Sequence, residues 1–378
     1  MRCEFELGQV CSRLSSGKGI PAREVHETGE YPVYGGNGLR GYTNRFNFEG
    51  DCAIIGRQGA FCGNVRYFAG KAYMTEHAVV VCANKDHNTR YLAYLLSTMN
   101  LGRLSGQSAQ PGLSVKTLAK QSVWLPSLDH QKQIVAVLSS LDDKIELNQK
   151  INENLERQAQ TVFSEWLATY EAVSNEISLG EICQKITDGS HFSPKDNPQS
   201  TIPMLSVKDM GEFDFNLSAC KHISEDDYQK MVANDCVPKV NDILVAKDGS
   251  YLKEIFICNE RRKLAILSSI AIFRPNTEKV LPEILLAFLK SPRVIQEVRD
   301  NYVSGSALPR IVLKDFKKLR FLLPNIAAQN EILPFLSAIR LQIAINIAEN
   351  QHFISLRDSL LPRLMSGEID VSDIALSC

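Results

Sequence analysis

One uninterrupted heptad pattern, between Ser127 and Trp166, limits what this chain can fold into more than any other stretch. Its seam positions alternate four and three residues apart, as they do in a helix that packs against a partner helix in a coiled coil. The seam consists of Ile134, Leu138, Leu141, Ile145, Asn148, Asn152, Leu155, Ala159, Val162 and Trp166. A buried asparagine is costly unless another polar group meets its amide. The pattern therefore predicts a long helix whose partner also carries polar groups at its centre.

The partner helix follows from an internal duplication of the chain. Residues 5–11 recur as residues 177–183, and residues 111–118 recur 198 positions later as residues 309–316. A second long helix should therefore begin near Asn325, a residue type that caps helix N-termini, as Ser127 does for the first helix. Its seam consists of Ile332, Leu336, Ile339, Ile343, Asn346, Asn350, Phe353, Arg357, Leu360 and Leu364.

The two seams match if the helices pack antiparallel about a pseudo-twofold axis. Facing residues then have numbers that sum to 498, and the central layers pair Asn148 with Asn350 and Asn152 with Asn346. Apolar residues face apolar ones outside this centre, except where Leu141 faces Arg357. Because paired buried amides select one alignment of a coiled coil, we expect the asparagine layers to fix the register of the helix pair.

The regions that precede each long helix have a different pattern. Short β-branched runs at residues 52–55, 78–81, 242–245 and 270–273 alternate with clusters of Gly, Asn, Asp and Pro. Helical segments are expected at residues 91–99 and 282–291. The predicted fold class is α+β: two duplicated mixed domains with mainly antiparallel sheets, joined by two long helices that form an antiparallel coiled coil. The expected boundaries are 1–126 and 175–324 for the mixed domains, 127–174 for the first helix, and 325–378 for the second helix, which should end near Ser366, together with a C-terminal tail.

Composition narrows the class of protein further. The chain has 378 residues, of which 44% are hydrophobic, and a formal net charge of −1, as expected for a folded protein of more than one domain. No basic segment followed by an apolar core opens the chain, and its longest apolar run, residues 264–273, is too short to span a bilayer. A cytoplasmic location is therefore expected.

Residues 1–125 carry 14 Lys/Arg against 9 Asp/Glu, whereas the long helices are acidic. This polarity suits phosphate contact by the mixed domains, although an ordinary solvated surface explains it equally well.

Polar turns in the first mixed domain supply candidate DNA-binding residues. Residues 36–41 match the dinucleotide fingerprint G-x-G-x-x-G, but the polar and aromatic residues that follow do not form the helix that this fingerprint must open. A flexible loop or edge strand that presents Asn37, Arg40 and Tyr42 is the better interpretation. Arg57 and Gln58 follow a buried strand in a tight turn, where they would suit guanine and adenine edges; a plain hairpin turn with a solvated arginine is the alternative.

The second mixed domain offers similar turns. One of them contains Asp188, Ser190 and His191, and another contains Lys247, Asp248 and Ser250, with Lys247 expected to point outward as Arg57 does. Serine-rich and glycine-rich segments before each domain's final strand would let the backbone approach a phosphate. The remaining candidate DNA contacts are Ser105, Gln107, Ser108, Gln110, Lys208, Ser304, Ser306, Arg310 and Lys314.

Several catalytic chemistries lack the motif that they need. The sequence has no G-x-x-x-x-G-K-[ST] loop for ATP, no Ser-His-Asp order of a hydrolase, and no zinc spacing among its ten cysteines. Asn197, Pro198 and Gln199 are not followed by the aromatic residue of an amino-methyltransferase motif. We therefore expect a binding protein without catalytic residues, cofactors or metals of its own.

Long stretches of the chain resemble the specificity subunits of type I restriction-modification enzymes. The resemblance is carried by LPSLDHQKQIVAVLSSLDDKIELNQKINENLE after the first domain, by residues 360–369, and by the turns at residues 31–38 and 186–191. It implies two target-recognition domains that bind double-stranded DNA and two helices that pack antiparallel. It also implies partner subunits: modification subunits that bind S-adenosylmethionine, and restriction subunits that use ATP and Mg²⁺.

The expected function is recognition of a split, asymmetric DNA site. Each mixed domain would read one half-site, and the helix pair, with a seam about 50 Å long, would hold the halves apart and dock the modification subunits. A stand-alone methyltransferase or nuclease with a coiled-coil arm is one alternative. A structural adaptor that does not read bases is another.

Overall fold

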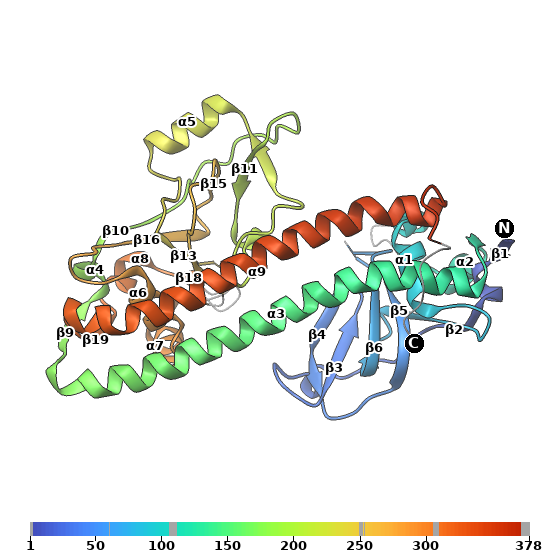
Figure 1. Ribbon diagram of the computed structural model, residues 1–378, viewed down its shortest axis with the longest axis horizontal. Helices are drawn as coiled ribbons and strands as arrows, with labels where there is room; N and C mark the ends of the chain where they lie inside the picture. The colour runs from blue at the N-terminus through green and yellow to red at the C-terminus, as the bar shows by residue number, and fades with distance from the viewer. Residues whose placement is uncertain are drawn as a thin grey trace. The chain divides into compact units, whose positions relative to one another are not determined.

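The computed structural model describes residues 3–59, 61–105, 112–248, 252, 254–304 and 310–371. The chain forms two compact units, one made of Met1–Ile145 with His352–Cys378 and the other of Glu146–Gln351. Each unit contains one mixed domain and one part of each long helix, α3 (Leu128–Tyr170) and α9 (Ile326–Ser366) (Figure 1). The two long helices therefore begin and end close to the predicted positions.

The first mixed domain is built on a six-stranded sheet with the order β2-β7-β5-β6-β3-β4. All neighbouring strands are antiparallel except β3 and β6, which are parallel. The strands are β2 (Cys11–Ser16), β3 (Tyr31–Gly35), β4 (Gly38–Thr43), β5 (Phe48–Gly56), β6 (Val65–Met74) and β7 (Ala78–Ala83). The sequence thus correctly predicted strands within β5 and β7.

Both faces of this sheet are buried at its centre, which explains why these two strands are continuous apolar runs. Ala53 and Val79 belong to the core that contains α1 (Thr89–Ser97), whereas Ile54 and Val80 belong to a second core on the opposite face. Asn88 caps α1 by accepting a hydrogen bond from the backbone N–H of Tyr91 at 2.9 Å. The domain is completed by α2 (Val115–Ala119) and by a two-stranded sheet of β1 (Cys3–Glu6) and β8 (Ser122–Leu125).

The second mixed domain contains a four-stranded antiparallel sheet with the order β10-β16-β13-β14 and a three-stranded sheet with the order β12-β11-β15. The β11–β15 pair is parallel. The strands are β10 (Cys183–Asp188), β11 (Ile202–Leu205), β12 (Lys221–Ile223), β13 (Ile243–Ala246), β14 (Ile255–Ile257), β15 (Ala265–Ile266) and β16 (Ile270–Pro275). Strands β13 and β16 occupy the positions that the sequence predicted.

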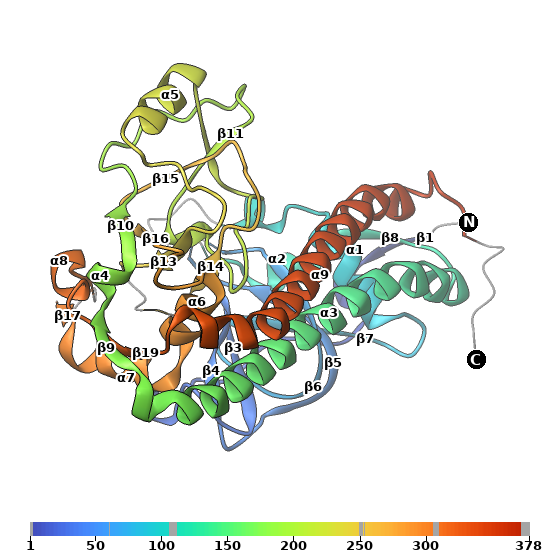
Figure 2. The ribbon, with the colours of Figure 1, turned by 60° about the vertical axis from the view of Figure 1, so that its left-hand side comes forward.

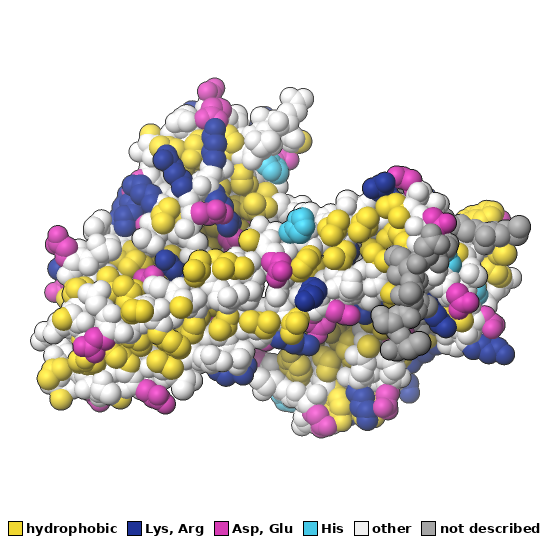
Figure 3. Space-filling view, in the orientation of Figure 1, with side chains coloured by type: hydrophobic (Ala, Val, Ile, Leu, Met, Phe, Trp, Pro, Cys, Tyr) yellow, Lys and Arg dark blue, Asp and Glu magenta, His cyan; other side chains and the backbone are white. Residues whose placement is uncertain are grey.

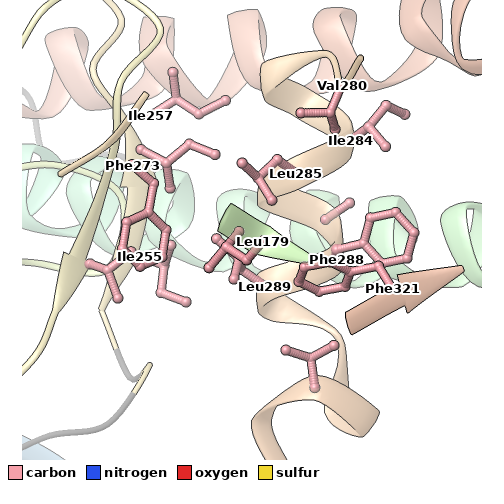
Figure 4. Close-up of a cluster of buried hydrophobic side chains, with 14 of the residues drawn as sticks. Leu179, Ile255, Ile257, Phe273, Val280, Ile284, Leu285, Phe288, Leu289 and Phe321 are labelled. Carbon is pink, nitrogen blue, oxygen red and sulfur yellow. The ribbon is translucent and has the colours of Figure 1, made fainter. Parts of the chain in front are cut away.

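Helices cover these sheets. They are α4 (Leu179–Ile182), α5 (Glu225–Ala233), α6 (Pro282–Lys290), α7 (Pro292–Asn301) and α8 (Leu313–Phe316). Helix α5 lies beside β11 and β15 (Figure 2). The main core of this unit packs α6 against the sheet, with Leu285, Phe288 and Leu289 directed toward Leu179, Phe273 and Phe321 (Figure 4).

The duplication predicted from the sequence is visible in equivalent elements. Strands β9 (Asn175–Ser178) and β19 (Arg320–Leu323) pair in the second unit as β1 and β8 pair in the first. The next backbone bonds also match, because the N–H of Leu7 donates to Gln121 O and the N–H of Leu179 donates to Leu319 O, both at 2.8 Å. A short ladder of β17 (Val303–Ser304) and β18 (Arg310–Ile311) follows α7.

The long helices pack antiparallel within each unit. In the second unit, Asn148 Nδ2 donates to Asn350 Oδ1 at 2.9 Å and Asn346 Nδ2 donates to Asn152 Oδ1 at 2.7 Å, so the predicted layers form. Residues from the other seam layers lie in the cores of the two units. In the first unit, the layer predicted to pair Leu141 with Arg357 contains an ion pair that compensates the arginine, because Arg357 Nη1 lies 2.9 Å from Asp142 Oδ1.

The ends of the long helices also agree with the caps that the sequence predicts. Asn325 Oδ1 accepts a hydrogen bond from the N–H of Ala328 at 3.0 Å, and Ser127 Oγ accepts a longer one from His130 at 3.4 Å. Gly367 ends α9 with a φ of +80°, in the left-handed region that favours glycine. Among the described residues, α9 is the one helix long and apolar enough to cross a membrane, yet its buried seam contains Asn346 and Asn350.

Candidate nucleic-acid interface

In the first mixed domain, three turns bring polar side chains to one open hollow. The β3–β4 turn contributes Asn37, strand β4 contributes Arg40, the turn after β5 contributes Gln58, and the turn between β6 and β7 contributes His77. Asn37, Arg40 and Gln58 are exposed, and the His77 side chain is 43% exposed. The hollow therefore presents amide, guanidinium and imidazole groups, which can donate to or accept from base edges and phosphates.

Two glycines allow these turns to come together. A Cβ on Gly36 would lie only 3.2 Å from His77 O and 3.3 Å from Gln58 O, so a larger residue would push the turns apart. Gly38 has a φ of +96°, which an L-residue rarely adopts, and it starts strand β4 of the hairpin. The predicted loop at residues 36–41 is thus an edge hairpin, and it is not the start of a helix as a dinucleotide site requires.

The other candidates of the first domain lie outside the hollow. Arg57 Nη1 is 3.5 Å from both Ser16 Oγ and Glu76 O, at the limit of a hydrogen bond. Tyr42 is half-buried, and its backbone exchanges two hydrogen bonds with His26. Ser105 Oγ donates to Gly102 O at 2.7 Å, which makes it part of a local turn. The candidates Gln107, Ser108 and Gln110 lie outside the described residues.

In the second mixed domain, Asp188 is the centre of the candidate cluster. Its carboxylate forms an ion pair with Lys247 Nζ and lies 3.4 Å from His191 Nε2. The three residues meet because β10 and β13 both pair with β16, so that their ends lie on either side of one strand. Lys247 was predicted to point outward, but its side chain is only 8% exposed because the Asp188 carboxylate compensates its charge inside the domain.

Ser190, adjacent to this cluster, stabilises the turn itself. It is buried, its Oγ donates to Phe192 O at 2.8 Å, and its N–H donates to Ile266 O at 2.8 Å. His191 is by contrast 76% exposed. His191 is therefore placed to reach a ligand, as is the neighbouring Phe192, which is 62% exposed.

The remaining candidates of the second domain are spread more widely. Lys208 is exposed in a short 3₁₀ turn whose first residue, Val207, donates its N–H to Ser269 Oγ at 3.0 Å. The N–H of Lys247 donates to the carbonyl of the same serine, also at 3.0 Å, so Lys208 lies near the Asp188 cluster. Asp248 follows Lys247 and is half-buried, whereas Lys314 is exposed in α8. The backbones of Ser304 and Arg310 pair in the β17–β18 ladder, and Ser250 and Ser306 lie outside the described residues.

Sequence reasoning missed two kinds of residue. The first is His77. Little in the sequence marks its turn as a binding site, and in the structure its Nε2 lies 3.2 Å from Oε1 of its neighbour Glu76. The second is a set of arginines paired within the second domain. Arg262 forms a two-pronged ion pair with Asp214, at 2.7 Å for each oxygen, and Arg274 contacts both Asp242 and Asp235. These arginines add positive charge to the composition while their charge is compensated inside the fold.

Asp235 shows how strongly this charge network acts. Burial raises the pKa of Asp235, but hydrogen bonds from Lys185 and Arg274 outweigh that effect and hold the pKa at about 2, below its ordinary value of 3.8. Within the part of the chain that the structure describes, no group of three or more His, Cys, Asp and Glu residues could hold a metal ion.

Comparison with known proteins gives a consistent result. The family described as "Type I restriction modification DNA specificity domain" matches residues 3–157 and 173–352. The specificity subunit of the type I restriction enzyme EcoprrI from Escherichia coli is 40% identical over 140 residues, which cover 36% of this chain but only 35% of that protein. The specificity subunit of the type I restriction enzyme MjaIX from Methanocaldococcus jannaschii is 25% identical over 315 residues, or 76% of this chain and 70% of that one.

A solved structure supports the fold. The S subunit of the type I restriction-modification system from M. genitalium aligns with a TM-score of 0.51 and 15% identity, over 96% of each chain. At this level of identity the likeness concerns the fold alone, and it agrees with two duplicated mixed domains and their long helices.

Proposed function

The chain belongs to the type I restriction modification DNA specificity domain family, and on that premise we propose that it is the DNA-specificity subunit of a type I restriction-modification complex. Each mixed domain would read one half of a split DNA site. Because the two domains carry different polar clusters, the half-sites should differ in sequence. The observation that carries this proposal is the convergence of Asn37, Arg40, Gln58 and His77 from separate turns at one open hollow.

The chemistry of that hollow suits base readout. An arginine can contact the O6 and N7 atoms of guanine with two hydrogen bonds, and an asparagine or glutamine can do the same with the N6 and N7 atoms of adenine. The hollow is formed by an edge hairpin and two turns, so its side chains can approach a groove. Exposed basic residues such as Lys208 and Lys314 would add contacts to phosphates, which position a domain without specifying sequence.

The helix pair would set the spacing of the half-sites. Helix α3 has 43 residues and α9 has 41. At about 1.5 Å per residue, each is about 60 Å long, which suits half-sites about one DNA turn apart or somewhat further. The asparagine layers would then define the length of this spacer by selecting one register.

The exposed faces of the long helices would dock the modification subunits. In the second unit, Leu341 and Ile345 of α9 are 63% and 51% exposed, and Leu147 of α3 is 49% exposed. Figure 3 shows hydrophobic side chains along both helices. Large exposed apolar residues that recur along a helix are typical of a surface that another protein covers.

In this proposal the chain itself is not catalytic and works in the cytoplasm. Modification subunits would bind S-adenosylmethionine, and restriction subunits would use ATP and Mg²⁺. Isothermal titration of the purified chain with S-adenosylmethionine separates this assignment from a stand-alone methyltransferase, because specific binding to the isolated chain would contradict it.

Domain exchange tests the DNA-reading role. Residues 1–125 are replaced by the corresponding region of a relative, and the methylated sites of host DNA are mapped with and without the exchanged chain. We expect one half of the site to change while the other half and the spacer stay the same. An unchanged site would favour a structural adaptor, and the wild-type chain expressed from the same vector is the control.

A further inference from the structure

Each mixed domain forms an equivalent hydrogen bond with its own long helix. In the first unit, the N–H of Asn88 donates to Gln131 Oε1 at 2.9 Å, and in the second the N–H of Leu281 donates to Gln329 Oε1 at 2.9 Å. Asn88 and Leu281 are the N-cap residues of α1 and α6, and both helices have nine residues. Helices α1 and α6 therefore occupy equivalent places on α3 and α9, residue for residue.

Equivalent side chains close to these contacts carry opposite charges. Position two of the domain helix is Arg90 in α1 and Glu283 in α6. On the long helices, where equivalent residues are 198 apart, Asp142 of α3 corresponds to Arg340 of α9. The sign of the charge is thus reversed on both sides of the contact.

In the first unit, the arginine belongs to the domain and the acids belong to the long helix. Arg90 Nη2 lies 2.9 Å from Asp143 Oδ1 and 3.9 Å from Asp142 Oδ2, and its side chain is only 21% exposed. The Tyr94 hydroxyl donates to the Asp142 carboxylate, which links a second residue of α1 to the same acid. The Arg90 guanidinium also lies 5.0 Å from the centre of the Tyr67 ring.

In the second unit, the acid belongs to the domain and the arginine belongs to the long helix. Glu283 Oε1 lies 3.1 Å from Arg340 Nη2 and accepts a hydrogen bond from Ser337 Oγ at 3.2 Å. The Glu283 side chain is 9% exposed, so a like charge opposite it could not be screened well by water.

We propose that this reversed charge contact, Arg90 with Asp142 and Asp143 in one unit and Glu283 with Arg340 in the other, assigns each mixed domain to its own long helix. On the first helix, the second domain would bring Glu283 against Asp143 and against Asp142, whose other oxygen lies 2.9 Å from Arg357 Nη1. On the second helix, the first domain would bring Arg90 against Arg340. The shared backbone N–H contacts to Gln131 Oε1 and Gln329 Oε1 would accept either domain, whereas the charges accept only one. A domain that fits the first position thus carries a basic residue at position two of this helix, and a domain that fits the second position carries an acidic one.

This inference rests on contacts within each unit and does not depend on DNA reading. Charge exchange in the full-length chain tests it, with thermal unfolding as the measurement. Glu283→Arg and Arg340→Glu should each lower the unfolding temperature by about 2–6 °C, and the double variant should recover most of that loss. The matched control is the exposed pair of Glu225 and Lys263, where the same exchange should have little effect. A double variant as unstable as the sum of the single variants overturns the proposal.

A chimera tests the choice between positions. Residues 177–323 are replaced by a second copy of residues 5–125, so that the copied Arg90 faces Arg340. Arg340→Asp should raise the unfolding temperature of the chimera and lower that of the native chain. A decrease in both proteins would mean that the charge does not select the domain. If the chimera does not fold with or without Arg340→Asp, the selection is also refuted, because the substitution is expected to rescue docking.

Discussion

The buried pair of Asn152 and Asn346 offers the sharpest test of the coiled-coil argument. These side chains are 2% and 5% exposed, and Asn346 Nδ2 donates to Asn152 Oδ1 at 2.7 Å. Asn152→Leu removes the acceptor and leaves a buried amide donor without it, which costs about 1–3 kcal/mol. In a unit of this size that cost lowers the unfolding temperature by about 2–12 °C. Differential scanning calorimetry of the full-length chain measures the shift.

The double variant Asn152→Leu with Asn346→Leu should regain the lost stability, because two apolar side chains then face each other in the layer. Asn154→Leu is the matched control, since Asn154 is exposed on the same helix and its replacement should change little. If the double variant were less stable than Asn152→Leu alone, the amide pair would not be the cause of the cost, and the reasoning would be refuted.

Three further predictions follow from the described contacts. Gln329→Ala should lower the unfolding temperature by several degrees, because the buried Gln329 side chain accepts from the N–H of Leu281 and donates to the carbonyls of Lys279 and Pro324; calorimetry checks this. Since the folded pKa of Asp235 is about 2 and its ordinary value is 3.8, its ion pairs stabilise the fold above about pH 4 and lose that contribution as the pH falls toward 2. Asp235→Asn should therefore flatten the dependence of the unfolding temperature on pH over that range. Arg40→Ala should weaken DNA binding by about 1–3 kcal/mol and relax specificity in one half-site only, as measured by fluorescence anisotropy with duplexes altered in either half.

The sequence predicted the long-range order of the helices because duplication and heptad spacing are both global patterns. The facing numbers that sum to 498 follow from the two seams once the helices are taken to pack antiparallel about a pseudo-twofold axis, and the structure confirms the polar layers of this alignment. Strands β5 and β7 were also predictable, since continuous apolar runs mark strands that are buried on both faces.

The candidate sites were less predictable, because they depend on pairings that no local pattern encodes. The hollow in the first domain forms because β3 pairs in parallel with β6, which brings the turn that contains Asn37 near the turn that contains His77. The outward orientation expected for Lys247 was wrong for a similar reason. Its ion pair with Asp188 forms because β10 and β13, which are far apart in the sequence, pair with the two sides of β16, so that their ends lie close together.

The duplicated domains combine one contact that was kept with one that was reversed. Gln131 and Gln329 are fully buried, and the Oε1 of each accepts a hydrogen bond from the backbone N–H of a helix N-cap residue, a contact that does not depend on that residue's side chain. Arg90 and Glu283, equivalent in position, bind side chains of opposite sign and therefore distinguish one domain from the other. A chain that arose by duplication needs both kinds of contact. A common backbone contact lets each copy dock, and a divergent charge contact would match each copy to its own long helix.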